Sequence, residues 1–225
     1  MVIVGIDQSL NNTGMTILRE GHEPSHFSVI PEKGMVGVRR TSMVSSRIRD
    51  IVAGTIEAGD HLVICREGYS YGSASSSVFD LGEMGGCIDM KLFESVNRDG
   101  IGSIKYYNIP PNSWKLLILG AGNVKKDTQY LLTAYNKTGI QFTDDNIADS
   151  HMIALSMKKI LTASFDSLTL KDKMGMVSSN IRKKKKVTEK NIGKITEEEF
   201  KELVKATMRE YLIFEFDGGN GGTGI

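Results

Sequence analysis

Short, nearly continuous apolar runs alternate with segments of helical periodicity over the first two thirds of the chain. Such runs are typical of strands buried on both faces inside a sheet, and the periodic segments are typical of covering helices. Strands are predicted at residues 2–7, 15–18, 25–30, 61–67 and 104–107. Helices are predicted at residues 37–57, 113–119 and 124–137, from Thr143 to about Ala163, and where Leu81, Met84, Ile88 and Leu92 follow helical spacing. The pattern predicts an α/β domain over residues 1–163.

The pattern changes after residue 163. Residues 164–194 are largely polar and carry nine Lys or Arg against three Asp or Glu, centred on Arg182-Lys183-Lys184-Lys185-Lys186. Such a run is usually a solvated, mobile segment, although on a nucleic-acid enzyme it is also a natural phosphate-binding arm. Thr196 opens a capping box and an amphipathic helix to about residue 214, followed by a Gly-rich tail. We therefore expect a basic linker or arm at 164–195 and a C-terminal helix and tail at 196–225.

The composition, 40% hydrophobic and 24% charged over 225 residues, is that of an ordinary soluble globular protein. The formal net charge of +1 identifies no partner. Cys65 and Cys87 lie in apolar contexts without paired spacing, which predicts buried thiols in a reducing compartment rather than a zinc site. No apolar run approaches the roughly 20 residues of a membrane span, and no signal peptide is recognised. We therefore expect a cytoplasmic protein without a membrane partner.

Two of the predicted buried strands end in a carboxylate. Val2-Ile3-Val4-Gly5-Ile6 leads directly into Asp7, and the strand that begins at His61 ends in Glu67. If the two strands are adjacent and parallel, both acids lie at the carboxyl end of the sheet, where sites of open α/β folds form. For Asp7 taken alone, a cap of the following turn is an equally good interpretation.

A further group of acids opens the late helix. Thr143 is a suitable N-cap, and Asp144 and Asp145 complement the helix dipole. The dipole explains Asp149, one full turn further in, less well. Carboxylates that repel one another are kept together mainly by divalent cations, and their oxygen ligands suit Mg²⁺ or Mn²⁺. A pair of such ions about 4 Å apart can promote in-line hydrolysis of a phosphodiester.

In combination, these residues resemble the RuvC-like Holliday-junction resolvases of the ribonuclease H-like superfamily, the phage versions in particular. The matching pieces are Gly5-Ile6-Asp7-Gln8-Ser9 with Thr13-Gly14, Glu67-Gly68, Gly120-Ala121-Gly122 with the lysines that follow, and Ala148-Asp149-Ser150. The resemblance covers about residues 1–163. It implies a five-stranded mixed sheet flanked by helices, with the first three strands antiparallel and the next two parallel. It also implies a homodimer that nicks opposing strands of a four-way DNA junction, in the host cytoplasm if the protein is phage-encoded.

The resemblance also implies roles for single residues. Asp7, Glu67 and Asp149 become the ligands of two metal ions, and Lys126 contacts or polarises the scissile phosphate. Contacts with DNA are implied for Lys115, Lys125, Lys126 and one of Tyr69 and Tyr71, and the basic run Arg182, Lys183, Lys184, Lys185 and Lys186 is expected to add phosphate contacts. A solvent-facing loop is the alternative for the two tyrosines.

One position departs from the family pattern, which usually has two carboxylates three residues apart on the last helix. This chain has Asn146 at the first of them, so the fourth metal ligand is either Asp145 or the amide oxygen of Asn146. The helix that carries Leu81, Met84, Ile88 and Leu92 corresponds to the family's dimerisation helix. Packing of that stripe within its own domain fits the sequence equally well.

Two other functions stay open. Phosphotransferases of the actin and sugar-kinase type also begin with a strand, Gly-Ile-Asp and a Thr-Gly hairpin, but they need two such domains, and this chain has no second hairpin of the kind. A junction-binding protein with little or no catalysis is suggested by Asn146. Hydrolysis of ATP without DNA cleavage would favour the first, and tight junction binding without Mg²⁺-dependent nicking would favour the second.

Overall fold

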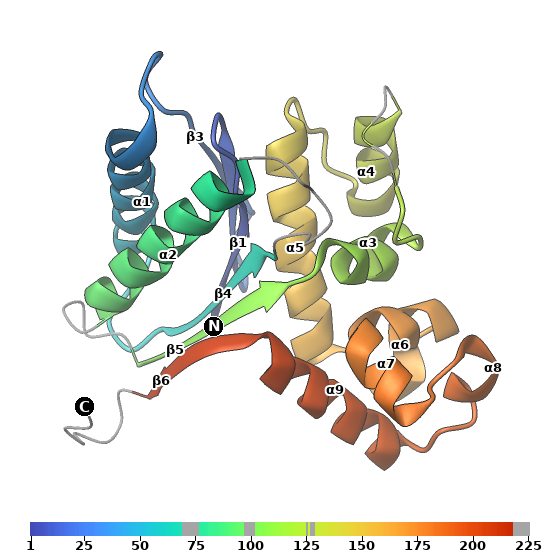
Figure 1. The fold of residues 1–225 in the computed structure, drawn as a ribbon. Helices are drawn as coiled ribbons and strands as arrows, with labels where there is room; N and C mark the ends of the chain where they lie inside the picture. Colours follow the sequence, from blue (N-terminus) through green and yellow to red (C-terminus); the bar gives the residue numbers. More distant parts are fainter. Residues whose placement is uncertain (69–76, 97–101, 125, 127–128, 218–225) are drawn as a thin grey trace.

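The computed structural model describes residues 1–68, 77–96, 102–124, 126 and 129–217. Its centre is a six-stranded mixed sheet with strand order β3-β2-β1-β4-β5-β6 (Figure 1). The strands are β1 (Val2–Asp7), β2 (Thr13–Arg19), β3 (Ser25–Val29), β4 (His61–Glu67), β5 (Ser103–Ile109) and β6 (Leu212–Asp217). β1, β2 and β3 pair antiparallel, β4 runs parallel to both β1 and β5, and β6 is antiparallel to β5.

The α/β fold class and the directions of the five predicted strands are confirmed, but the number of strands is not. The sixth strand comes from the C-terminal segment, where the expected helix to about residue 214 ends at Tyr211. No glycine or proline separates the helix from the strand, so nothing in the sequence marks the end of the helix before the apolar run that begins at Leu212. Its alternating Phe214 and Phe216 pack on the core, as a strand requires.

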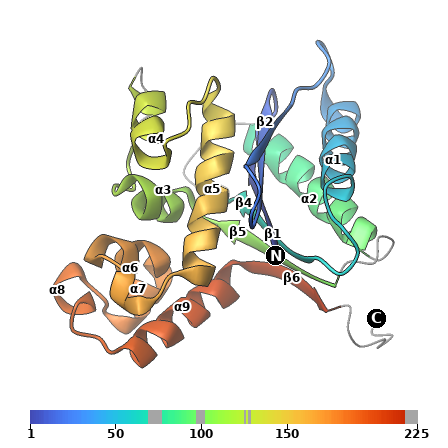
Figure 2. The same ribbon diagram turned by 180° about the vertical axis from the view of Figure 1, so that it is seen from behind.

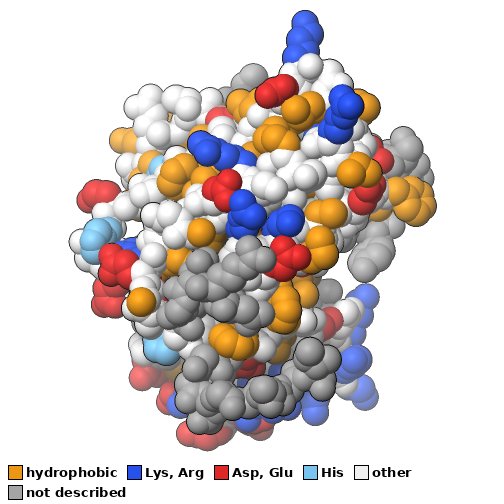
Figure 3. Space-filling model, turned by 90° about the vertical axis from the view of Figure 1, so that its left-hand side faces the viewer, with side chains coloured by type: hydrophobic (Ala, Val, Ile, Leu, Met, Phe, Trp, Pro, Cys, Tyr) orange, Lys and Arg blue, Asp and Glu red, His pale blue; other side chains and the backbone are white. Residues whose placement is uncertain are grey.

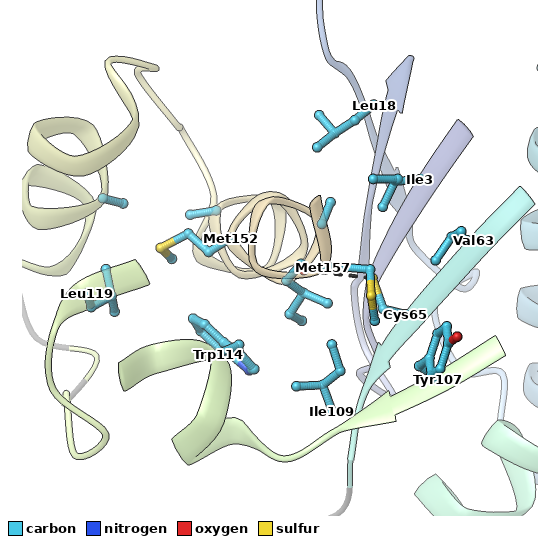
Figure 4. Close-up of a cluster of buried hydrophobic side chains, with 14 of the residues drawn as sticks. Ile3, Leu18, Val63, Cys65, Tyr107, Ile109, Trp114, Leu119, Met152 and Met157 are labelled. Carbon is cyan, nitrogen blue, oxygen red and sulfur yellow. Dashed lines mark hydrogen bonds between the residues drawn. The ribbon is translucent and has the colours of Figure 1, made fainter. Parts of the chain in front are cut away.

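Helices cover both faces of this sheet, as Figures 1 and 2 show from opposite sides. On one face lie α1 (Gly37–Ala53) and α2 (Ser77–Val96), and on the other lie α3 (Pro111–Leu119), α4 (Tyr130–Thr138) and α5 (Asp145–Thr162). Because side chains alternate along a strand, β1 sends Val2, Val4 and Ile6 into the core under α1 and α2, and Ile3 into the core under α5. The second core is drawn in Figure 4, with Trp114, Met152 and Met157 between the helices and the strands.

Two glycines bring α5 unusually close to the sheet. A Cβ at Gly5 would overlap the carbonyl oxygen of Ser150, and a Cβ at Gly14 would overlap the carbonyl oxygen of Asn146. Any side chain at these positions would therefore displace the N-terminal half of α5 from β1 and β2. The close approach fixes the depth at which Asp149 lies against the end of β1.

The stripe Leu81, Met84, Ile88 and Leu92 faces the sheet. Met84, Ile88 and Leu92 are fully buried in the core shared with α1, and Leu81 packs against it. The stripe thus packs within its own chain, and contact with a second copy would have to use the opposite face of α2. Figure 3 views the molecule from the side where α1 and α2 lie, and hydrophobic side chains are interspersed there with charged ones.

Residues 164–195, expected as a basic linker or arm, contain regular secondary structure. They fold into the short helices η1 (Phe165–Ser167), α6 (Leu170–Met176), α7 (Ser179–Lys185) and α8 (Glu189–Ile192), which α9 (Glu197–Tyr211) connects to β6. Capping side chains explain these helices in a polar sequence, because Thr169, Ser178 and Thr196 each accept a bond from a first-turn N–H. The division of the chain at residue 163 stays a prediction, although β6 belongs to the same sheet as β1–β5.

This C-terminal segment packs rigidly on α3 and α5. A Cβ at Gly175 would come within 2.9 Å of the Cα of Leu117 in α3, and Lys159 of α5 forms an ion pair of 2.5 Å with Asp172. The helix expected at 124–137 is shorter than predicted, because α4 begins at Tyr130.

Among the described helices, none is long and apolar enough to cross a membrane.

Candidate active site

Three acids from distant parts of the sequence converge at the carboxyl end of the sheet. Asp7 ends β1, Glu67 ends the adjacent parallel strand β4, and Asp149 lies one turn into α5. One carboxylate oxygen from each lies within 4.8 Å of the others. The expected meeting of Asp7 and Glu67 follows from the parallel register, in which Ile6 is opposite Arg66. Metal ligation by the three acids remains a prediction.

Polar contacts fix the start of α5 against the first hairpin. Asp144 is the N-cap and accepts hydrogen bonds from the backbone N–H groups of Asn146 and Ile147. Its other oxygen accepts from the side chain of Asn12 at 2.7 Å, and Thr16 and Ser150 share a buried hydroxyl contact of 2.9 Å. These contacts orient α5 so that Asp149 faces the end of β1.

Two aromatic side chains donate hydrogen bonds to the acids. Trp114 Nε1 donates to Glu67 Oε2 at 3.1 Å, and the Tyr130 hydroxyl donates to Asp149 Oδ1. Neither hydrogen bond could be predicted from the sequence, because periodicity shows only that Trp114 is apolar and buried. The sequence gives one indication of the contact between Trp114 and Glu67: Trp114 is the single tryptophan of the chain, and it follows β5, the strand next to β4.

Lys126 is the positive charge of this cluster. Its Nζ lies 2.8 Å from Asp149, 3.1 Å from Asp145 and 3.9 Å from Asp7. Burial alone would lower the pKa of Lys126, but the neighbouring carboxylates of Asp149 and Asp7 outweigh burial and raise it. The lysine therefore stays protonated at neutral pH.

The acids themselves are destabilised as anions. Burial raises the pKa of Asp7 well above its usual range, and the nearby carboxylates of Asp149 and Glu67 raise it further. Burial and the charge of Asp149 also raise the pKa of Glu67. Burial also raises the pKa of Asp149, although the positive charge of Lys126 opposes this rise. One ammonium group thus compensates the cluster incompletely.

The donor set fits a divalent cation. Carboxylate oxygens are the ligands that Mg²⁺ and Mn²⁺ prefer, and repulsion among buried carboxylates is what such a cation removes. The ammonium of Lys126 marks a position among these oxygens at which positive charge is stabilised. Asp7, Glu67 and Asp149 are the residues that could hold the ion, with Asp145 at the margin of the cluster.

Of the other predicted site residues, some lie beside the acid cluster, some lie away from it, and some fall outside the described residues. Lys115, in α3, lies close enough to Glu67 and Asp149 for its charge to oppose the rise that burial causes in the pKa of both carboxyls. Asn146 makes its contacts here through its backbone, against Asp144 and Gly14. The basic run does not join the cluster: Arg182, Lys183, Lys184, Lys185 and Lys186 lie on α7 and at its C-cap. Tyr69, Tyr71 and Lys125 lie outside the described residues.

The sheet order and the helices on both faces define a ribonuclease H-like α/β fold. No protein-family model and no curated protein matches the sequence. Among solved structures, Thermus thermophilus RuvC matches with a TM-score of 0.52 at 17% identity, over 69% of this chain and 92% of RuvC. T. thermophilus RuvC in complex with Holliday junction substrate matches with a TM-score of 0.51 at 17% identity, over 69% and 91%. The chain therefore has a RuvC-like fold of the ribonuclease H-like class.

The raised pKa of Asp7 leads to a prediction about stability. A carboxyl with a raised pKa in the folded state costs nothing below its unfolded value of 3.8, and it destabilises the fold as the pH rises and the group must ionise. Without divalent cations, Asp7→Asn should therefore raise Tm at pH 7, by about 3 °C for roughly 1 kcal/mol in a chain of this size. The gain should disappear at low pH. Thermal unfolding followed by circular dichroism measures it.

Asp166→Asn is the matched control, because Asp166 is an exposed aspartate outside the cluster. It should leave Tm unchanged at either pH. A lower Tm for Asp7→Asn at pH 7 would contradict the repulsion inferred for the cluster.

Proposed function

We propose that this protein is a metal-dependent, structure-selective DNA endonuclease that resolves four-way (Holliday) and related branched junctions by paired nicks. The observation that carries the proposal is the convergence of Asp7, Glu67 and Asp149 at the carboxyl end of the sheet in a RuvC-like fold. A solved structure of T. thermophilus RuvC contains a Holliday junction substrate, which supports branched DNA as the partner. The class of reaction is hydrolysis of a phosphodiester bond.

The acids of the cluster would bind the metal ions, and its lysine would contact the phosphate. Asp7, Glu67 and Asp149 would hold the cations, and Trp114 and Tyr130 orient two of these carboxylates through their donated bonds. A pair of bound Mg²⁺ ions, or Mn²⁺ in their place, would supply activation of water and stabilisation of the leaving oxygen. Lys126 stays protonated, so once cations neutralise the acids its ammonium can contact a phosphate oxygen of the strand to be cut.

Asp145 is the better candidate for the fourth oxygen ligand. Its carboxylate lies 3.1 Å from Lys126 Nζ, which also contacts Asp149, and its charge contributes to the raised pKa of Asp7. The backbone of Asn146 lies close to the hairpin, with its carbonyl oxygen against Gly14. A full set of carboxylates argues against the alternative of a junction-binding protein without catalysis.

Contacts with DNA around the cluster are proposed for Lys115, Lys125 and Lys126, and for one of Tyr69 and Tyr71 as the aromatic that stacks at the opened junction. The proximity of Lys115 to Glu67 and Asp149 supports its part in this set. Positive charge beside the acids would offset their repulsion of the DNA backbone.

Asp7→Asn tests the proposed chemistry. It should abolish Mg²⁺-dependent paired nicking of a four-way junction, a loss of at least about a thousandfold in rate, since activation of the water depends on the metal. It should leave junction binding in chelator within about twofold. The measurements are cleavage of end-labelled junctions and of a matched linear duplex, and gel-shift titration in EDTA.

Asp166→Asn serves again as the exposed control and should cut like the wild type. Vigorous Mg²⁺-dependent cleavage by Asp7→Asn would refute the assigned role. Junction binding by the wild type without nicking would favour the non-catalytic alternative. Hydrolysis of ATP without DNA cleavage would favour the phosphotransferase alternative.

The basic segment from Arg182 to Lys186 is proposed to contact phosphates of a DNA arm. The side chains of Lys183 to Lys186 are exposed, and within the described part of the chain Lys183, Lys184 and Lys185 form no ion pair. The segment follows α6, whose Gly175 lies against Leu117 of α3, and α3 also carries Trp114 and Lys115. Because this basic segment has a fixed position relative to the acid cluster, it could bind one arm of the DNA junction while the acid cluster cuts another arm.

Changing Lys183, Lys184 and Lys185 together to Gln should weaken junction binding. The slope of log K against log salt should fall by about 0.9 for each phosphate contact removed. Lys201→Gln with Lys205→Gln is the matched control, because these lysines of α9 are paired with Glu197 and Glu202. Fluorescence anisotropy across a salt series measures the slopes, and equal slopes for all three proteins would contradict the contact.

A homodimer is proposed to pair through the outer face of α2. Phe79 and Met90 are exposed there by 84% and 52%, and a Cβ at Gly82 or Gly86 would meet no atom within 4 Å. The face is therefore apolar and open to close approach by another helix. A two-fold axis beside α2 would relate two acid clusters, as coordinated cutting of a symmetric junction requires.

Met90→Glu should shift the protein to the monomer, because it places a charge in an apolar contact. Leu132→Glu is the control, since Leu132 is 58% exposed on α4, away from the proposed interface. Sedimentation velocity measures the assembly state. A monomeric wild type, or a fully dimeric Met90→Glu, would contradict this interface.

A further inference from the structure

A second set of polar side chains lies next to the acids in the sequence but on the opposite face of the sheet. Arg66, which precedes Glu67, is 2% exposed and follows four apolar residues of its strand, residues 62–65. Its Nη1 donates to Gln8 Oε1 at 2.6 Å, and Gln8 follows Asp7. Two neighbours of proposed metal ligands are thus bonded to each other across β1 and β4.

The backbone pairing of these strands stops just short of the acids. The parallel register of β1 and β4 runs from Val2 opposite Leu62 to Ile6 opposite Arg66. Asp7 and Glu67 lie one residue beyond the last pair, at the point where repulsion between their carboxylates acts to separate the strand ends. The bond from Arg66 to Gln8 connects the two strands at this point, through side chains instead of the backbone.

Both side chains are also attached to α2. Arg66 Nη2 donates to Asp89 Oδ2 at 3.2 Å, and Gln8 Nε2 donates to the carbonyl oxygen of Leu81. A planar guanidinium can hold Gln8 and Asp89 at the same time, because its donors diverge in a fixed fork. The ends of both strands are therefore fastened to one helix whose inner face is fully buried.

We propose that Arg66, with Gln8 and Asp89, is a positioning residue that fixes the separation of Asp7 and Glu67 for divalent cations. Arg66 lies on the far face of the sheet from the carboxylates and acts through the backbone of the two strand ends. The inference rests on the proposed function in one respect, that Asp7 and Glu67 bind metal.

Arg66→Lys is the variant that tests this role. Lysine keeps the charge that Asp89 requires, but its single ammonium lacks the fork that joins Asp89 to Gln8. Groups that hydrogen-bond directly to metal ligands typically change metal affinity by about tenfold to a hundredfold, and Arg66, which acts one step further away, is expected at the lower end of that range. Calorimetric titration with Mn²⁺ at 15 °C, without DNA, should show weaker binding by about tenfold in Arg66→Lys, and a similar loss in Gln8→Met.

Arg19→Lys is the matched control. Arg19 is also a strand arginine, donating to Asp60 at 2.8 Å and to the Thr55 carbonyl at 2.9 Å, but it pairs with Val2 at the opposite end of β1. It should lower Tm as much as Arg66→Lys does and leave Mn²⁺ affinity unchanged. A purely structural role for Arg66 would make the two variants behave alike.

If Arg66→Lys does not fold, Arg66→Met with Asp89→Leu replaces the ion pair by apolar side chains and leaves no buried charge unpaired. The same loss of Mn²⁺ affinity is expected, because the tie to Gln8 is gone. Wild-type affinity in whichever of these variants folds would overturn the inference and leave the proposed function standing. Absence of Mn²⁺ binding by the wild type would overturn the proposed function, and this inference with it.

Discussion

Repulsion among three clustered carboxylates, two of them buried and the third half-buried, is the constraint on which the rest of this structure depends. Asp7 and Asp149 are 8% and 1% exposed, and burial raises the pKa of each, as it does for Glu67. Such groups stay together only if the backbone that carries them cannot move apart. Two parallel strands and one helix provide that rigidity, and the glycines at positions 5 and 14 let the helix approach closely enough to complete the set.

Sequence reasoning found the acids because their signals are local. An apolar run that ends in a carboxylate is visible twice, before Asp7 and before Glu67, and one topological assumption brings the two ends together. Asp149 was a candidate because the helix dipole explains an acid one full turn into a helix less well than acids in its first turn. The directions of five strands followed from the family resemblance.

The remaining features depend on tertiary packing that leaves no local signal. Trp114 and Tyr130 reach the acids only because α3 and α4 pack beside α5. β6 follows α9 without a glycine or proline between them. The strand is therefore recognised only from its pairing with β5 in the folded structure. The segment after residue 163 is polar enough to be taken for an arm, but its short helices are capped by side chains and anchored to Leu117 and Lys159. Composition shows that a segment is polar, and it does not show whether the segment is packed.

Arg66 illustrates a feature of the sequence that becomes informative in retrospect. A charged residue inside an apolar strand is costly to bury, so it requires a partner on the face toward which it points. Because side chains alternate, that face is the one opposite Glu67. In this sheet an acid at a strand end therefore marks the face of the acid cluster, and the polar neighbour beside it lies on the other face. The pairs Asp7-Gln8 and Arg66-Glu67 have this form at adjacent strand ends, and their polar members meet. The same alternation that gathers the repelling charges on one side of the sheet thus places the groups that oppose their separation on the other.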